Sequence, residues 1–206
     1  TGRSKIYVDK ILQTISGEYF KNYEIKNVLR NKNSVSLYYG SANEYFEYDH
    51  VIFATHADTT LKLINNPTEG EKKILKNFEY KKNVAYLHND IFFMPKNRKA
   101  WSSWNAILDK HDLSKNCVTY WLNRLQNLKT QKDYFLTLNP ITNIDKSKII
   151  KKVEFFHPFY DMKTVKAQKY LSELQGVNNS WFCGSYFGYG FHEDGLNSGI
   201  DVSKKL

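Results

Sequence analysis

Apolar residues recur every three to four positions at the start of the chain. Five residues carry this spacing: Ile6, Tyr7, Ile11, Leu12 and Ile15. The spacing predicts an amphipathic helix that ends at Ser16 and Gly17. Alternating and continuous apolar runs then predict strands over 23–29, 35–39, 45–48 and 50–54.

The middle of the chain changes from helical spacing to aromatic strands. Helices are predicted over 58–64 and 68–77, the second because Thr68 can cap it and Glu71 follows three residues later. Strands rich in aromatic residues are predicted over 83–87, 100–105, 117–122, 135–138 and 151–156. Pro158 is predicted to end this sheet because proline donates no ladder hydrogen bond. A further helix is predicted over 164–174, stopped by Gly176.

The closing stretch, residues 181–206, combines a short apolar strand, a glycine-rich loop and a helix that opens near Gly195. Four of the chain's ten glycines lie between Gly184 and Gly195. Glycine lets the backbone approach a ligand closely, and a helix N-terminus presents free N–H groups and a positive dipole end. This combination favours a nucleotide-like cofactor. The alternative interpretation is a tight turn before an ordinary helix.

Two segments of the sequence resemble a known family. The closing stretch contains Gly184 and Ser185 directly after the strand, then the run Glu193-Asp194-Gly195-Leu196-Asn197-Ser198-Gly199, and residues 49–55 read Asp-His-Val-Ile-Phe-Ala-Thr. These residues resemble the flavin-containing amine oxidoreductase family, which includes monoamine and polyamine oxidases, protoporphyrinogen oxidase and phytoene desaturases. The sequence of the glycine-rich loop is most similar to that of a bacterial branch of this family, described as predicted NAD/FAD-binding oxidoreductases. The resemblance covers nearly the whole chain.

The resemblance implies the C-terminal part of a two-domain fold. In this fold an α/β, Rossmann-like FAD/NAD(P)-binding domain is joined to an α+β substrate domain with an antiparallel sheet. Residues 1–55 and 179–206 would belong to the FAD-binding domain, and 56–178 to the substrate-binding domain. The sequence contains no Gly-x-Gly-x-x-Gly motif, so we expect an N-terminal half of the same protein to supply it. Alone, the segment is expected to bind FAD weakly, to be inactive and to leave a sheet edge exposed.

The resemblance also implies which residues contact FAD. The backbone N–H groups of Gly195, Leu196 and Asn197 would face the flavin and stabilise its anionic reduced ring. Ser185 stands where the family usually has Asp or Glu, so its hydroxyl would replace a carboxylate near the ribityl chain or phosphate. The other predicted cofactor contacts are Val28, Ala54, Thr55, Gly184, Asp194 and Ser198.

His192 and Lys82 are the predicted catalytic residues. His192 occupies the position of the second aromatic residue of the amine cage in amine oxidases, where an imidazole can act as acid, base or hydrogen-bond donor. Lys82, or Lys81 beside it, precedes a strand at which amine oxidases carry a lysine that bridges through water to the flavin. The alternatives are a histidine that only fills the loop and two lysines that only face solvent.

Because His192 replaces an aromatic residue of the amine cage, amine oxidation is not the first functional hypothesis. That hypothesis is hydride transfer from a small hydrophobic substrate, such as a fatty acyl or polyene chain, to FAD. Oxidation of amines is the second hypothesis. The third comes from the net charge of +9, which suits a non-catalytic basic module for nucleic acid or anionic membrane. No motif for specific nucleic-acid recognition accompanies the charge. A peripheral membrane contact is one interpretation of it, and the alternative is scattered surface lysines of the kind that an AT-rich coding sequence produces.

The composition also predicts the compartment of the protein and the kinds of site that it lacks. No apolar run approaches the roughly 18 residues of a membrane helix, and no signal-peptide core opens the chain. No zinc-ligand spacing occurs, so no metal site is expected. Cys117 and Cys183 are expected to be free thiols in a reducing compartment, which favours a cytoplasmic protein.

Overall fold

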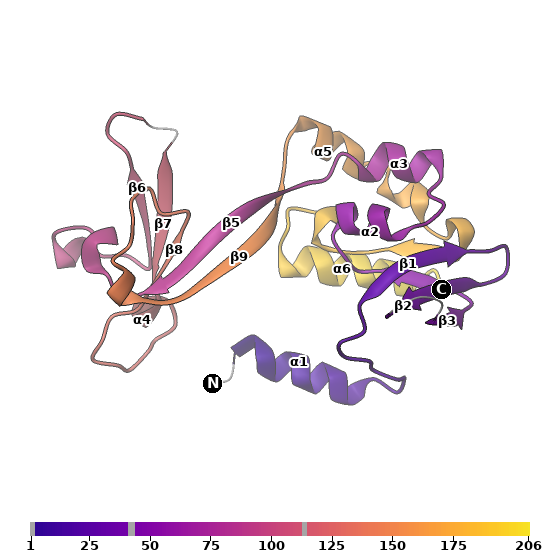
Figure 1. Ribbon diagram of the computed structural model, residues 1–206, viewed down its shortest axis with the longest axis horizontal. Helices are drawn as coiled ribbons and strands as arrows, with labels where there is room; N and C mark the ends of the chain where they lie inside the picture. Colours follow the sequence, from indigo (N-terminus) through magenta and orange to yellow (C-terminus); the bar gives the residue numbers. More distant parts are fainter. Residues whose placement is uncertain (1–2, 41–43, 113–114) are drawn as a thin grey trace. The chain divides into compact units, whose positions relative to one another are not determined.

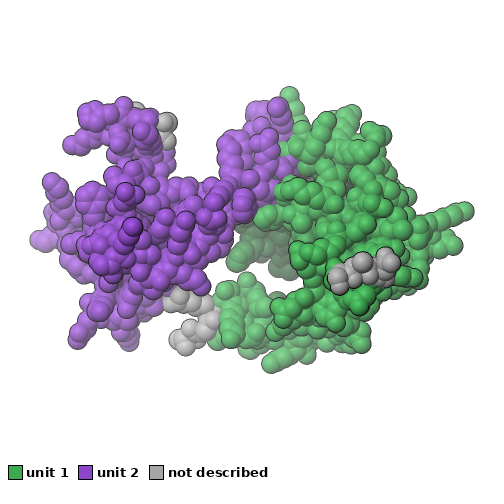
Figure 2. All heavy atoms as spheres, viewed as in Figure 1, with its two compact units in different colours: residues 1–77, 166–206 green, residues 78–165 purple. Residues whose placement is uncertain are grey.

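The computed structural model describes residues 3–40, 44–112 and 115–206. It divides into two compact units, unit 1 with residues 1–77 and 166–206, and unit 2 with residues 78–165 (Figure 2). The predicted domain segments 1–55, 56–178 and 179–206 stay a prediction. In the compact units, the helices just after residue 55 and just before residue 179 pack within unit 1.

Unit 1 opens with a helix and a small antiparallel sheet (Figure 1). The helix is α1 (Arg3–Thr14), and the strands β1 (Ile25–Arg30), β2 (Val35–Tyr39) and β3 (Glu44–Tyr48) pair in the order β1-β2-β3. These elements agree with the sequence pattern. The apolar face of α1 stays open to solvent in the described part of the chain, with Ile11 55% exposed.

Two parallel strands join distant parts of the chain in unit 1. Strand β4 (Val51–Phe53) pairs with β10 (Ser180–Phe182) in parallel register. Helices α2 (Ala57–Leu63) and α3 (Glu69–Leu75) follow β4. The predicted capping box of α3 is confirmed, since the Glu71 N–H donates to Thr68 Oγ1 at 3.1 Å and the Thr68 N–H donates to Glu71 Oε2 at 2.7 Å. Two strands do not make a complete Rossmann-like sheet, so that part of the fold stays a prediction.

A buried ion pair connects the elements of unit 1. The side chains of Arg30 and Glu71 are both completely buried and form a bidentate pair. Arg30 Nη2 also donates to the Asn66 carbonyl at 2.8 Å, and its Nη1 donates to the Ser180 hydroxyl at 3.3 Å. Because these residues come from β1, α3 and β10, the pair holds three elements that are far apart in sequence.

Unit 2 is built on an antiparallel sheet of five strands in the order β6-β7-β8-β5-β9, as the resemblance implied. The strands are β5 (Glu79–His88), β6 (Trp104–Leu108), β7 (Asn116–Trp121), β8 (Phe135–Leu138) and β9 (Ile149–Phe159). Helix α4 (Leu122–Leu125) and the 3₁₀ turns η1 (Ile91–Phe93), η2 (Arg98–Ala100) and η3 (Lys146–Lys148) connect them.

The two faces of the five-stranded sheet differ in chemistry. Successive residues of a strand alternate between faces, so the register assigns each side chain to one of them. One face carries His88, Thr119, Thr137 and Phe135, and all four are buried. The opposite face carries a partly exposed apolar set: Leu87, Trp104, Val118, Tyr120, Leu136, Leu138 and Phe155.

Several predicted elements have different limits in the structure; the strand expected over 83–87, for example, is β5 (Glu79–His88). Three further differences have a clear physical reason. The strand expected over 100–105 begins at Trp104, because the Asn97 side chain accepts the Lys99 N–H and starts η2. Pro158 does not end the sheet, since β9 continues to Phe159 and an edge strand tolerates a residue without an N–H. The helix expected over 164–174 is divided into α5 (Met162–Gln168) and the 3₁₀ turn η4 (Leu171–Leu174).

The helices and the two cysteines bear on what the composition predicts. Within the described residues, no helix is long and apolar enough to cross a membrane. Cys117 and Cys183 are both buried and free, as expected. Burial raises the pKa of both thiols, which disfavours the reactive thiolate.

Candidate functional site

The carboxyl ends of β4 and β10 lie at the same edge of their parallel pair. The Cys183 N–H donates to the Phe53 carbonyl at 3.0 Å and extends the pairing by one residue. Ala54 and Thr55 continue from β4, and Gly184 and Ser185 continue from β10. Ligands of open α/β sheets bind at such carboxyl ends. The fold therefore brings four predicted cofactor residues together where a cofactor is expected.

Gly184 turns the chain out of β10 in a conformation that favours glycine. Its φ is +149°, and a Cβ there would approach the Tyr186 ring to 2.8 Å. The Gly184 N–H donates to the Ser198 hydroxyl at 2.9 Å, and that hydroxyl donates to the Gly195 carbonyl at 2.8 Å. Ser198 is buried and thereby ties α6 (His192–Ser203) to the end of β10. Its direct contact with cofactor stays a prediction.

Asp194 holds the glycine-rich loop in shape. Its Oδ2 accepts the Tyr189 N–H at 3.0 Å and the Phe191 N–H at 2.8 Å. Gly188 lies against the same carboxylate so closely that a Cβ would overlap it. The contacts of Asp194 are therefore with the protein's own loop, and a direct contact with the cofactor stays a prediction.

Helix α6 begins at His192 and not near Gly195, so the predicted helix start is wrong. The Asp194 carboxylate accepts the N–H of Phe191, the residue before the helix, and so begins it one turn earlier. The Gly195 N–H already donates to the Phe191 carbonyl at 3.3 Å. The N–H groups without intrahelical partners are therefore those of His192, Glu193 and Asp194. Contacts of Leu196 and Asn197, both exposed, with a flavin stay predictions.

Gly195 keeps α6 close to the loop that follows β10. A Cβ at this position would lie 3.6 Å from the Ser185 backbone nitrogen, so a longer side chain would enter the space beside Ser185. Gly184 and Gly195 have no side chains and lie next to a helix N-terminus. A flat ring or a phosphate can therefore approach the backbone at these positions. The residues present therefore fit an FAD.

Two glutamines that the sequence reasoning missed shape this site. Gln168 Nε2 donates to the carbonyls of Tyr186 at 3.0 Å and Gly188 at 2.6 Å, which fixes the turn η6 (Ser185–Phe187) and the loop after it. Gln175 pairs with both backbone groups of Phe182, accepting its N–H at 2.9 Å and donating to its carbonyl at 2.7 Å. Glutamine in a helical segment carries no local signal for such roles, because its partners are set by tertiary packing.

The parallel pair has one closed and one open edge. Gln175 covers the outer edge of β10 as a neighbouring strand would. Strand β4 pairs only with β10 among the described residues, and Ile52 within it is 48% exposed. The sheet edge that was expected to be exposed is therefore that of β4.

The other predicted site residues lie in different surroundings. His192 is the exposed first residue of α6, and Thr55 shares a hydrogen bond of 2.7 Å with the buried Thr60. Val28 lies in β1, where its carbonyl accepts the Asn65 N–H at 3.0 Å. Lys82 belongs to unit 2, where it forms an ion pair with Glu154 at 2.7 Å. Its predicted catalytic role stays a prediction.

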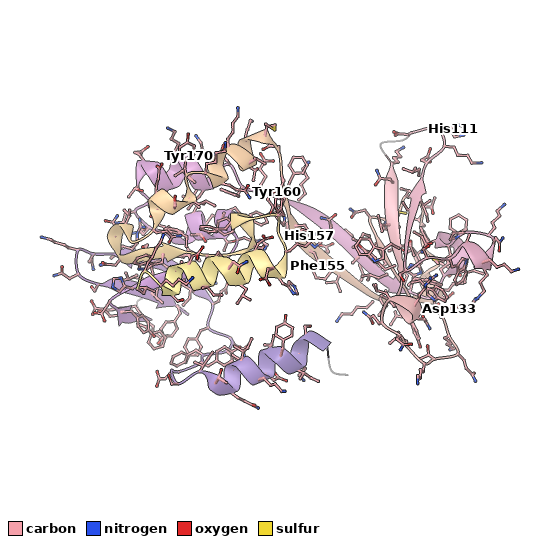
Figure 3. The ribbon with its side chains drawn as sticks, turned by 180° about the vertical axis from the view of Figure 1, so that it is seen from behind. His111, Asp133, Phe155, His157, Tyr160 and Tyr170 are labelled. Atoms are coloured by element: carbon pink, nitrogen blue, oxygen red, sulfur yellow. The ribbon has the colours of Figure 1, made fainter. Side chains whose placement is uncertain are left out.

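Unit 2 contains a cavity and an aromatic row that a ligand can contact. The cavity measures about 510 Å³ and is lined by Val84, Tyr86, Asn139, Pro140, Thr142, Asn143, Ile144, Lys146 and Ile149. Figure 3 shows Phe155 and His157 along β9. Their ring centroids lie 5.9 Å apart. Nearby, Lys81 Nζ lies 3.3 Å from the centre of the Phe159 ring, a cation–π contact.

Known proteins resemble this chain in fold. Neither a family model nor a curated protein matches the sequence. Among solved structures, the CLA-producing fatty acid isomerase from P. acnes has a TM-score of 0.68 at 14% identity, covering 98% of this chain and 52% of the isomerase. Putrescine oxidase bound to putrescine has a TM-score of 0.65 at 10% identity, over 99% of this chain and 52% of the oxidase.

Cyclohexylamine oxidase from Brevibacterium oxydans IH-35A is a third similar structure, with a TM-score of 0.57 at 10% identity, over 88% of this chain and 47% of that protein. At these identities the similarity shows a shared fold. The chain spans about half the length of each of these proteins. It therefore has the fold of part of these enzymes, with the antiparallel sheet that the family resemblance implied.

Proposed function

We propose that this chain is the C-terminal portion of an FAD-dependent oxidoreductase that transfers a hydride from a hydrophobic substrate, such as a fatty acyl or polyene chain, to the flavin. One observation carries the proposal. Ala54, Thr55, Gly184 and Ser185 follow two paired parallel strands at one edge, beside the N-terminus of α6. The fold shared with two oxidases adds support.

FAD, when bound, supplies the hydride acceptor, and the protein supplies binding and orientation. The free N–H groups and positive dipole end of α6 favour negative charge at its N-terminus. Asp194 and Ser198 keep that terminus fixed through the loop and the end of β10. His192, exposed in the first turn, is the proposed proton donor or acceptor at its imidazole.

The apolar face of the five-stranded sheet supports a hydrophobic substrate. Trp104 is 64% exposed and Phe155 45% exposed, and Trp104 lies edge-on to Tyr120 with ring centroids 5.0 Å apart. Leaving such rings in water is unfavourable unless a ligand or another part of the protein covers them. An extended apolar chain is the substrate class that would bury the most apolar surface on this face.

We assign the missing pyrophosphate-binding loop to an N-terminal half of the same protein. The open edge of β4 supports this assignment, because one more parallel strand can pair there while Gln175 closes the edge of β10. A strand followed by Gly-x-Gly-x-x-Gly would place its loop at the same carboxyl edge as Ala54 and Gly184. The chain alone is accordingly expected to be inactive.

The test is FAD binding by the protein that contains this chain together with its upstream segment. The purified protein should be yellow with a flavin spectrum, and Gly195→Leu should weaken FAD binding at least about tenfold because the side chain enters the space beside Ser185. Gly199→Ala is the matched control, since nothing lies within 4 Å of a Cβ there. A correctly folded protein that stays colourless with excess FAD would reject the proposal.

Amine oxidation is the second candidate function. The similarity in fold to putrescine oxidase and cyclohexylamine oxidase favours it. A flavin-loaded protein of this kind should release hydrogen peroxide with putrescine or cyclohexylamine. A yellow protein that is silent across a panel of amines but is reduced by a fatty acyl or polyene substrate would decide for the first candidate.

A further inference from the structure

The positive charge of the chain is concentrated in unit 2. Residues 78–165 contain fifteen Lys and Arg against eight Asp and Glu, a formal net charge of +7. Unit 1 contains fifteen against thirteen, a net charge of only +2. The basic character of the protein therefore belongs to the sheet unit, which points to an anionic partner for that unit.

The 3₁₀ turn η1 in the same unit exposes two large apolar side chains. Ile91 is 62% exposed and Phe92 is 69% exposed, while the next residue, Phe93, is 1% exposed and packs with Cys117 and Ile144. The turn thus directs one ring into the core and two apolar side chains into solvent. Scattered exposed apolar residues are common, but two adjacent large apolar side chains exposed on one turn form a site that water disfavours.

The Asp90 side chain holds the turn and links it to a lysine. The buried Asp90 accepts the Phe92 N–H at 3.2 Å and forms an ion pair with Lys148 at 3.0 Å. This pair places η3, which carries Lys146 and Lys148, next to η1. Lys96 and Lys99, both exposed, follow within the next seven residues of the chain.

We propose that η1 and its lysines, here called the apolar–basic tip (Ile91, Phe92, Lys96, Lys99 and Lys146), dock the protein onto an anionic lipid surface. Ile91 and Phe92 would insert at the level of the headgroups while the lysines contact lipid phosphates. A lipid surface explains both features, whereas a nucleic acid would use the lysines but leave the aliphatic Ile91 without a partner. The inference is independent of the flavin proposal.

Vesicle co-sedimentation of the full chain tests the proposal. The protein should sediment with vesicles of phosphatidylcholine and phosphatidylglycerol at about 0.1 M salt, and much less with phosphatidylcholine alone. Binding should fall steeply toward 1 M salt, where the Debye length shrinks from about 10 to about 3 Å. Absence of binding to the anionic vesicles at about 0.1 M salt would overturn the proposal.

Matched variants locate the contact. Ile91→Ser combined with Phe92→Ser should lower the partition coefficient about tenfold or more, because two apolar insertions are lost. The control, Met162→Ser combined with Val165→Ser, removes two exposed apolar side chains elsewhere in the chain and should bind like the unmodified protein. Equal binding by the tip variant, or an equal loss in the control, would overturn the assignment to η1.

Charge variants separate a membrane from a nucleic acid. Lys96→Glu combined with Lys146→Glu should reduce vesicle binding by about fivefold or more for each lysine, and more than the control pair Lys110→Glu with Lys129→Glu. Duplex DNA should compete weakly. Tight DNA binding that the serine variant of η1 leaves unchanged would instead assign the basic surface to nucleic acid and overturn the membrane proposal.

Discussion

Both units bury polar groups at their centres, but they do so in opposite ways. Unit 1 buries the charged pair of Arg30 and Glu71. Unit 2 buries a neutral chain, in which His88 Nε2 donates to Thr137 Oγ1 at 2.7 Å and Thr137 bonds Thr119 at 2.8 Å. The Asp90 N–H donates to His88 Nδ1 at 3.0 Å, which sets this tautomer. Burial lowers the pKa of His88 to about 4, so its imidazole is neutral near pH 7.

Because of this difference, we expect different changes to destabilise the two units. A buried ion pair resists changes in the surrounding salt but fails when one partner is removed, because the other charge is left in a nonpolar interior. The histidine chain itself is neutral, although the buried Asp90 beside it is ion-paired with Lys148, and acid forces a proton onto the imidazole. Unit 1 is therefore expected to be sensitive to mutation of one side chain, and unit 2 to pH.

The largest expected effect comes from breaking the ion pair. Glu71→Ala removes the partner of Arg30 and half of the α3 capping box, and should destabilise unit 1 by about 3–5 kcal/mol. Hydrogen exchange, which reports each unit separately, should show the loss in unit 1. Glu69→Ala in the same helix is the control, because its carboxylate is exposed and should leave exchange unchanged. Equal exchange in both variants would contradict the role of the pair.

Acid should weaken unit 2 next. The ordinary pKa of histidine is 6.5, so the unfolded chain takes up a proton near that pH, whereas the folded chain takes it up only near pH 4. Stability is therefore complete above about pH 6.5 and falls as the pH drops toward 4, by about 3 kcal/mol in total.

Urea unfolding followed by tryptophan fluorescence reports mainly this unit, because three of the four tryptophans lie in it: Trp101, Trp104 and Trp121. His88→Gln has no group to protonate at this position and should show a flatter pH profile over the same range. An unchanged profile in this variant would show that other groups cause the acid sensitivity.

The smallest expected effect concerns the exposed pair of Lys82 and Glu154. Both side chains are about half exposed, so Lys82→Ala should change the urea midpoint of unit 2 by less than the error of the measurement. The same variant tests the catalytic prediction for Lys82, since a lower rate of flavin reduction at unchanged stability would support it. Unchanged stability and rate together would leave this lysine as a surface residue.

Much of the local structure follows from the sequence alone. The capping box of Thr68 and Glu71, the strands β2 and β8, and the apolar strands that lead into Ala54 and Gly184 are all encoded by residues close together in the chain. Patterns of this kind are readable because the hydrogen bonds and side-chain contacts that produce them join neighbours. The family resemblance at the closing stretch also located the candidate cofactor edge.

Tertiary structure decided what those local patterns left undetermined. Glu71 acts as a cap in its own sequence neighbourhood, but its pairing with Arg30 depends on how β1 and α3 pack. Likewise, Asp194 moves the start of α6 to His192, Gln175 closes the edge of β10, and Pro158 remains in a strand because that strand is at the edge. Each of these outcomes depends on a partner or a position in a sheet that only the folded chain supplies, because hydrogen-bond partners distant in sequence are selected by packing and not by local spacing.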